Sequence, residues 1–324
     1  MGEREIIETI QKRLTPMPKM PVPFGDDVAA CSLDDDNVAV LKTDMLVDKT
    51  DVPQGMSLWQ AARKAVVMNI SDFAAKGVKP LAMLVSLGLP RNLTRSNIEA
   101  IGDGLNAGAQ EYDSYVIGGD TGESSDLIIS LSVFGTARRK CIMLRSETKP
   151  GDIVAVTGSF GKPTSGLKLL SEKLNAPKEI REALIDSVFM PHARLKEGLA
   201  LGQSGAVTAS IDSSDGLAWS LHEIARASRV GFVIDKLPKA EETVKLAEAH
   251  GLDLLELTLY GGEEYELVVT VKPNLLNGAM KAVEEVGGRL LPVGKATSEK
   301  RIVLNIEGRQ SVIEPRGWEH FKSS

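Results

Sequence analysis

The chain has 324 residues, of which 43% are hydrophobic and 25% are charged, and its formal net charge at pH 7 is −6. This composition is typical of a globular protein, and the length allows two domains of ordinary size. An acidic chain without a block of Lys or Arg residues is not expected to bind nucleic acid through a basic face. A phosphorylated substrate is compatible with this charge, because bound metal ions can supply positive charge locally.

Three further features exclude other classes of protein. The two cysteines, Cys31 and Cys141, do not form a C-x-x-C motif, so neither a zinc site nor a disulfide scaffold is predicted. The first residues, MGEREIIETIQKRL, have the charged amphipathic pattern of a helix rather than that of a signal peptide. The apolar runs are far shorter than the roughly 20 residues that span a membrane. We therefore expect a cytoplasmic protein with no membrane partner.

The first half of the sequence mixes predicted strands with predicted helices. Short apolar runs rich in β-branched residues indicate strands, and longer periodic segments that end at glycine indicate helices. This order predicts an α+β domain in which helices cover a mixed sheet. The predicted strands are 28–33, 37–44, 80–90, 114–119 and 127–137, and the predicted helices are 57–77 and 94–113.

A turn-rich stretch, ETKPGD at residues 147–152, separates the two halves. Because proline and glycine interrupt regular structure, we place a domain boundary here, with domains at 1–146 and 147–324. The second half is again predicted to be α+β. Its predicted strands are 153–158, 206–212, 231–235, 265–271, 290–297 and 301–308, and its predicted helices lie within 163–202, at 214–228, near 239–258 and at 274–287.

Acidic residues fall at the ends of predicted strands and in glycine-rich turns. Asp26 and Asp27 are adjacent in the segment PVPFGDDVAACSL, where two carboxylates repel each other unless a cation lies close by. Asp72 differs, because it lies inside an apolar helical segment, where an unpaired buried carboxylate is costly. Without Asp26, the set has six members: Asp27, Asp44, Asp72, Asp120, Asp212 and Asp215.

Each of these acids also has a purely structural explanation. Asp215 could cap the helix that follows it, the Gly-Asp sequences are ordinary turn sequences, and Asp72 could lie on an exposed helix face. Taken together, however, six acids with few lysines beside them indicate a site for several magnesium ions. Magnesium takes oxygen ligands and often binds through a few carboxylates together with substrate phosphates.

The loop GSFGKPT is not a P-loop, because Pro163 stands where a Ser or Thr would bind the metal.

Eight short segments occur in order along nearly the whole chain: GDD, TDML, KAVVMNISDFAAKG, GGDTG, LRSETKPGD, IDSSDGL, GGEEYEL and GWEHF. Together they resemble the thiamine-monophosphate kinase family of the aminoimidazole ribonucleotide synthetase-like superfamily. The resemblance implies two α+β domains and a homodimer whose N-terminal sheets pack together, with ATP bound at that interface. It also implies Mg²⁺-dependent transfer of a phosphoryl group from ATP to thiamine monophosphate, which gives thiamine diphosphate.

The resemblance also implies the roles of particular residues. Direct in-line transfer is expected without a protein nucleophile, because phosphoryl transfer needs alignment and charge neutralisation more than covalent catalysis. The family often has a histidine after the TDML segment, and Asp51 stands at about that position here. The implied magnesium ligands are Asp27, Thr43, Asp44, Asp72, Asp120, Asp212 and Asp215; the implied ATP contacts are Gly119, Asp120, Arg145 and Ser214; the implied substrate contacts are Asp51, Glu263 and Trp318.

Alternatives within and outside the superfamily differ in their sequence requirements. A selenophosphate synthetase would carry a reactive Cys or selenocysteine in a glycine-rich N-terminal segment, and the hydrogenase maturation protein needs a C-terminal cysteine, whereas this chain ends FKSS. A regulatory protein that binds nucleotide without turnover is a further alternative, although it would need fewer metal ligands. For Trp318 the alternatives are a packing residue that anchors the tail and an indole that faces the cationic thiazolium of thiamine monophosphate.

Overall fold

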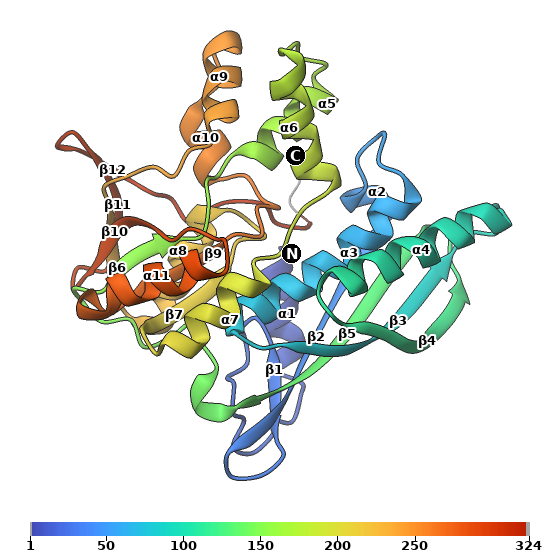
Figure 1. Ribbon diagram of the computed structural model, residues 1–324, viewed down its shortest axis with the longest axis horizontal. Helices are drawn as coiled ribbons and strands as arrows, with labels where there is room; N and C mark the ends of the chain where they lie inside the picture. The colour runs from blue at the N-terminus through green and yellow to red at the C-terminus, as the bar shows by residue number, and fades with distance from the viewer. Residues whose placement is uncertain (1, 322–324) are drawn as a thin grey trace.

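The structure is a computed structural model and describes residues 2–321. Two sheets, each with its own helices, lie on either side of a long central helix (Figure 1). The first sheet is built from the first half of the chain. The elements of this half are α1 (Glu3–Gln11), β1 (Ala29–Ser32), β2 (Asn37–Val47), α2 (Asp48–Asp51), α3 (Leu58–Lys76), β3 (Pro80–Leu89), α4 (Arg95–Glu111), β4 (Tyr115–Glu123) and β5 (Ile128–Arg138).

The second half follows a short 3₁₀ turn at Arg139–Cys141 and contains the larger sheet. Its strands are β6 (Ile153–Val156), β7 (Val207–Asp212), β8 (Gly231–Ile234), β9 (Leu267–Val271), β10 (Leu291–Thr297), β11 (Ile302–Ile306) and β12 (Arg309–Val312). Its helices are α5 (Lys162–Ser171), α6 (Lys178–Phe189), α7 (Leu195–Ser204), α8 (Leu217–Ser228), α9 (Glu241–His250), α10 (Leu254–Leu259) and α11 (Leu276–Glu285), with a 3₁₀ turn at Pro273–Leu275 before the last.

The first sheet has the strand order β1-β2-β5-β3-β4, and its β3–β4 pair is parallel while its other pairs are antiparallel. Helices α3 and α4 lie over one face of this sheet (Figure 1). Within the described residues, no helix covers the opposite face, which therefore exposes large apolar side chains. They include Leu41 and Met45 on β2, Leu81 and Leu84 on β3, Ile117 on β4 and Phe134 on β5.

Helix α3 joins the two halves. It begins with a capping box between Ser57 and Gln60 and ends at Gly77, whose φ of 65° suits a residue without a side chain. The helix packs against β2 and β5 of the first sheet and against α7 and β7 of the second half. Most of its residues are consequently buried, including the charged residues Arg63 and Lys64. A single apolar core runs from the first sheet to β9 on the far side of this helix.

The sequence predicted this architecture well. Every strand and long helix expected from the patterns is present, and the α+β class is confirmed. The structure adds the one-turn helix α2 and the edge strand β12, which the patterns did not predict. The stretch 147–152 connects the last strand of the first sheet to β6 of the second, and the division at residue 146 stays a prediction. Among residues 2–321 no helix is long and apolar enough to cross a membrane.

Candidate active site

Three buried carboxylates meet where α3 lies between the two halves. Asp27 comes from the loop before β1, Asp72 from the C-terminal part of α3 and Asp212 from the end of β7. One ligand oxygen from each lies within 4.8 Å of the others, and all three residues are buried. The structure therefore brings together acids that are far apart in the sequence, in an all-oxygen arrangement that suits a hard cation such as magnesium.

The adjacent pair Asp26 and Asp27 is neutralised by two cations of the chain itself. The Lys76 ammonium lies 2.6 Å from Asp26 Oδ1 and 2.6 Å from Asp27 Oδ2. The Arg145 guanidinium donates to Asp27 Oδ1 through Nε at 2.9 Å and also through Nη2, and Arg145 N donates to Asp26 Oδ2 at 3.1 Å. Burial alone would raise the pKa of Asp27, but the charges of Arg145 and Lys76 outweigh it and lower the pKa.

Asp72 has a cation partner from the neighbouring strand. Lys42 on β2 donates from Nζ to Asp72 Oδ1 at 2.9 Å, so Asp72 is neither unpaired nor on an exposed helix face. Burial raises the pKa of Asp72 well above its usual value, against the opposing effect of Lys42, and the charge of Asp212 adds to the rise. Burial would lower the pKa of Lys42, yet the Asp72 and Asp44 carboxylates raise it, so this lysine stays charged.

Within the described part of the chain, one side-chain donor serves the buried Asp212 carboxylate. Ser71 Oγ on α3 donates to Asp212 Oδ2 at 2.7 Å. Burial, together with the nearby charge of Asp27, raises the pKa of Asp212 to about 6. A carboxylate held in this way gains from a further positive charge, and a bound magnesium ion would provide it.

The remaining proposed magnesium ligands surround this cluster less closely. Asp44 follows Lys42 on the same strand, and its charge is close enough to raise the pKa of Lys42. Thr43 alternates to the open face of the sheet, where its hydroxyl donates to Leu131 O at 2.8 Å. Asp215 is exposed and does not cap α8, because the cap is Gly216 and no side chain bonds the first turn. The helix-cap explanation for Asp215 is therefore wrong.

Gly119 and Asp120 lie away from the cluster, on the exposed edge strand β4. The register pairs Gly119 with Val85, and β4 is separated from β2 by β3 and β5. Three strand spacings put Asp120 roughly 14 Å from the backbone of β2. A Cβ at Gly119 would come within 1.8 Å of Val85 O, so the close approach of these two strands requires glycine at this position.

The GGEEYEL segment is bonded directly to the loop that follows Asp212. Glu263 N donates to Ser214 O at 2.6 Å, and Tyr265 N donates to Ser213 O at 3.0 Å. Both Glu263 and Tyr265 have positive φ, 66° and 52°. Burial raises the pKa of the Tyr265 hydroxyl well above its usual value, and the charges of Glu263, Asp44, Asp212 and Asp51 add to this rise. Tyr265 is therefore close both to Asp212 of the acid cluster and to the proposed substrate residues Asp51 and Glu263.

Two of the proposed substrate residues share one partner. The buried Lys64 ammonium of α3 donates to Asp51 O at 2.9 Å and to Glu263 Oε1. The Asp51 carboxylate itself forms a hydrogen bond within its own turn, where Oδ2 accepts from Val47 N at 2.7 Å. The structure thus places Asp51 and Glu263 side by side, although they lie in different halves of the chain.

Trp318 is half exposed, with 51% of its surface accessible. Its backbone N donates to Asp215 O at 3.0 Å, which ties the C-terminal segment to the loop of the acid cluster. Its ring makes an edge contact with His320 at a centroid separation of 6.0 Å. Beside it lies a pocket of about 320 Å³, lined by Thr164, Lys168, Glu256, Leu257, Tyr260, Gly261, Arg316 and Gly317.

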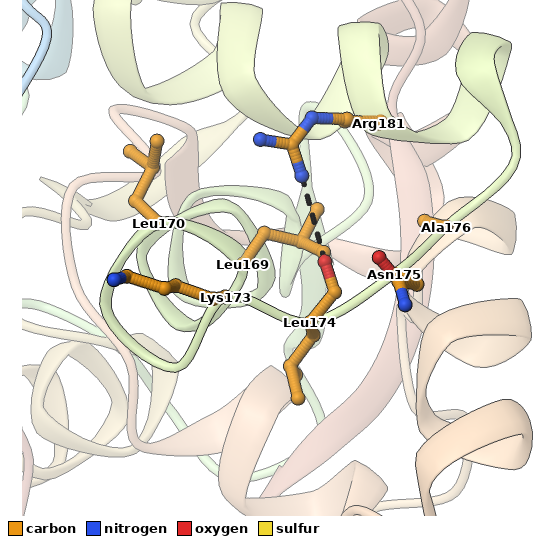
Figure 2. A pocket seen from close by; sticks show the side chains of 7 residues that line it. All are labelled: Leu169, Leu170, Lys173, Leu174, Asn175, Ala176 and Arg181. Carbon is orange, nitrogen blue, oxygen red and sulfur yellow. Dashed lines mark hydrogen bonds between the residues drawn. The ribbon is translucent and has the colours of Figure 1, made fainter.

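A second pocket of about 340 Å³ is formed where α5 turns towards α6 (Figure 2). Arg181 Nη1 donates to Leu174 O across it at 3.5 Å. None of the site residues predicted from the sequence lines this pocket. Its lining consists of Leu169, Leu170, Lys173, Leu174, Asn175, Ala176 and Arg181.

Sequence reasoning missed the cations of the site, namely Lys42, Lys64 and Lys76. A signal for two of them was present in the helix pattern. Lys64 and Lys76 lie in a segment of apolar residues that is long enough to be buried, and a lysine in such a helix needs a carboxylate partner. The partners come from other elements of the chain, so the pattern alone could not identify them.

Two family models match the chain in succession. The AIR synthase related protein N-terminal domain matches residues 25–137, and the C-terminal domain of the same family matches residues 149–307. The resemblance drawn from the eight segments is therefore confirmed.

Three curated relatives cover 92% to 99% of the chain. A thiamine-monophosphate kinase of Nitrosopumilus maritimus is 32% identical over 99% of this chain and 99% of its own. One from Pyrococcus horikoshii is 37% identical over 92% of this chain and 91% of its own. One from Bacillus subtilis is 32% identical over 99% of this chain and all of its own.

Solved structures agree with this relationship. The structure described as AaThiL complexed with AMPPCP and TMP has a TM-score of 0.85 at 28% identity, and it covers 99% of this chain and 97% of its own. The hydrogenase maturation protein HypE of E. coli has a TM-score of 0.70 at 19% identity, with 97% of this chain and 98% of its own covered, and shares the fold. The chain belongs to the thiamine-monophosphate kinase family.

Proposed function

We propose that this chain transfers the γ-phosphoryl group of ATP to the phosphate of thiamine monophosphate and so forms thiamine diphosphate. The observation that carries this proposal is the convergence of Asp27, Asp72 and Asp212 within 4.8 Å, next to the Glu263 segment. Full-length relatives named as thiamine-monophosphate kinases, and a related structure that holds both AMPPCP and TMP, support the same reaction. The cytoplasmic location expected from the sequence stays a prediction.

Magnesium is the cofactor that fits the acid cluster. Asp72 and Asp212 would supply buried oxygen ligands, and the charge of Asp44 is near enough to raise the pKa of Asp72. When bound, magnesium neutralises phosphate charge and orients the transferring group. Asp27 takes two roles in this scheme, because it also holds Arg145 and Lys76 in place beside the cluster. We assign Arg145 to ATP as well, since a guanidinium matches phosphate oxygens with two parallel hydrogen bonds.

The transfer is proposed to be direct. Among the described residues, the carboxylates near the cluster are paired with Lys, Arg or Ser donors, and we find no serine or cysteine there with a paired histidine base. Alignment of the two substrates and neutralisation of charge are sufficient for phosphoryl transfer. A labelled phosphoenzyme that forms and decays at the rate of turnover would contradict this proposal.

We also propose a homodimer in which the open faces of the five-stranded sheets pack together. This face exposes apolar side chains on four strands, and exposed apolar areas of this kind mark protein–protein contacts. Asp120 on β4 is too far from the acid cluster of its own chain to share one ion with it. A second chain on this face would give Gly119 and Asp120 a route to the nucleotide.

The dimer is tested by adding a charge to the open face. Leu84→Glu and Ile117→Glu should produce monomers in sedimentation experiments and should remove most of the activity, because a buried unpaired carboxylate opposes association. Met280→Glu, an exposed position on α11, serves as the matched control and should stay dimeric and active. A fully active monomer at assay concentration would disprove the dimer proposal.

The reaction itself is tested by incubating the purified chain with Mg-ATP and thiamine monophosphate. The expected result is thiamine diphosphate and ADP in equal amounts. Hydrolysis of ATP without thiamine diphosphate would point to another enzyme of the superfamily, and nucleotide binding without any turnover would point to a regulatory protein.

A further inference from the structure

The side chain of Lys64 is one of the most deeply buried charged groups of the described chain, with only 1% of its surface accessible. A buried ammonium needs partners that compensate for its lost hydration. Lys64 finds them outside its own helix, in the turn that ends at Asp51 and in the GGEEYEL segment at Glu263. One lysine on α3 thus connects three segments that are remote in the sequence.

The two partners are attached to two different segments of the proposed site. The turn at Asp51 follows β2 directly, and β2 carries Asp44 of the metal-binding set. Glu263 N bonds to Ser214 O, in the loop that begins at Asp212. A shift of Lys64 would therefore move both the turn and the loop relative to the acid cluster.

The Glu263 carboxylate is used on one side only. Its Oε1 accepts from Lys64, whereas among residues 2–321 no donor bonds its Oε2. The two side chains also differ in exposure: 27% of the Glu263 side chain is accessible, compared with 1% of the Lys64 side chain. The open Oε2 is therefore free to accept a hydrogen bond from a ligand on the accessible side of Glu263.

We propose that Lys64 is a positioning residue for the phosphoryl acceptor: it fixes the Glu263 carboxylate so that Oε2 is presented to thiamine monophosphate. This inference rests on the proposed function of the chain. The acceptor carries an exocyclic amine that can donate to such an oxygen and a cationic thiazolium that a nearby carboxylate attracts. Lys64 contributes nothing to ATP binding in this scheme, because its bonds go to Asp51 and Glu263 and not to the acid cluster.

The experiment compares Lys64→Met, Lys64→Arg and Glu263→Gln with the wild-type chain. Lys64→Met should raise the KM for thiamine monophosphate by about 10-fold or more and leave the KM for ATP within about 2-fold, because an interaction specific to one substrate is removed. Calorimetry without ATP should show the same loss of affinity for thiamine monophosphate. Lys64→Arg should be intermediate, because the larger guanidinium keeps the charge but does not fit the same space.

Two further variants separate positioning from simple folding. Lys64→Met combined with Glu263→Gln should weaken acceptor binding less than the product of the single effects, because both changes break the same unit. Lys79→Met removes an exposed ion pair to Asp113 and should leave both KM values within about 2-fold of wild type. Should Lys64→Met fail to fold, Glu263→Gln carries the test, since Glu263 is partly exposed.

The outcomes distinguish this inference from the proposed function. If the wild-type chain does not form thiamine diphosphate, the proposed function fails whatever the variants do. If the wild type turns over but Glu263→Gln leaves the acceptor KM unchanged, the positioning role is disproved. Equal increases in both KM values for Lys64→Met, or a lower melting temperature with unchanged KM values, would also overturn it.

Discussion

The two halves of the candidate site differ in how their charged residues are held. Asp27, Asp72 and Asp212 are buried, and each accepts hydrogen bonds or an ion pair from Lys, Arg or Ser side chains. Asp120 and Trp318, in contrast, are exposed. The buried half is therefore preorganised by the folded chain, because unpaired charges there would be costly.

The exposed half has no buried charges that need partners within the chain. Its contacts depend on what binds to it. Asp120 faces solvent on an edge strand, and Trp318 is anchored by its backbone rather than by its ring. Under the proposed function, Asp120 and Trp318 gain further partners from a ligand or from a second subunit. The comparison predicts large effects on turnover from changes in the buried half and selective effects on binding from changes in the exposed half.

The largest effect is expected from the buried cluster and from its partly buried neighbour Asp44. Asp212→Asn or Asp44→Asn should lower kcat by at least about 100-fold, the scale expected when stabilisation of a transferring phosphoryl group is lost. Activity should require Mg²⁺ and be lost with a chelator. The measurement is steady-state formation of thiamine diphosphate over a range of Mg²⁺ concentrations. Near-normal turnover in both variants would rule out catalysis by metals at this cluster.

The pH dependence of stability tests the burial of Asp212. Its pKa is raised from an ordinary 3.8 to about 6, so between these values the folded chain binds more protons than the unfolded chain. The free energy of unfolding of the metal-free chain should therefore fall as the pH rises from about 4 to about 6. Two pKa units correspond to about 3 kcal/mol at most.

Denaturant titrations of chelator-treated protein at several pH values give this free energy. Asp212→Asn should show a smaller fall over the same pH range, because the amide does not titrate. The remaining fall comes from other acids whose pKa is raised in the same direction, among them Asp72, Asp215 and Glu264. An identical pH profile for wild type and Asp212→Asn would assign the titration to other groups.

The smallest effect is expected from Trp318 in the exposed half. An indole face attracts a cation by roughly 0.5–2 kcal/mol, so Trp318→Ala should raise the KM for thiamine monophosphate by about 2- to 30-fold. The KM for ATP should change little. Initial rates with each substrate varied in turn measure both constants. A lower melting temperature with an unchanged acceptor KM would instead identify Trp318 as a packing residue of the C-terminal segment.

The positions of the strands and helices were predictable because they depend on local patterns. The helix 57–77, for example, is marked by its capping box and by the glycine that ends it, and both features are present in the structure. The glycine-rich turn that carries Asp212 and Asp215 was equally predictable from the sequence, although the N-cap of α8 is Gly216. Strand β12 escaped prediction because its four residues are all exposed and show no apolar alternation.

The sequence by itself determined which carboxylates are unusual, since Asp72 in an apolar helix and the adjacent Asp26 and Asp27 both require a nearby cation. It could not determine which cation each one has. Lys42, Lys76 and Arg145 reach these acids from other segments, at separations of up to 119 residues along the chain. Only the tertiary structure decides such pairs, because a buried charge binds whichever partner the packing of α3 between the two sheets brings within a few ångströms, and local patterns carry no record of that packing.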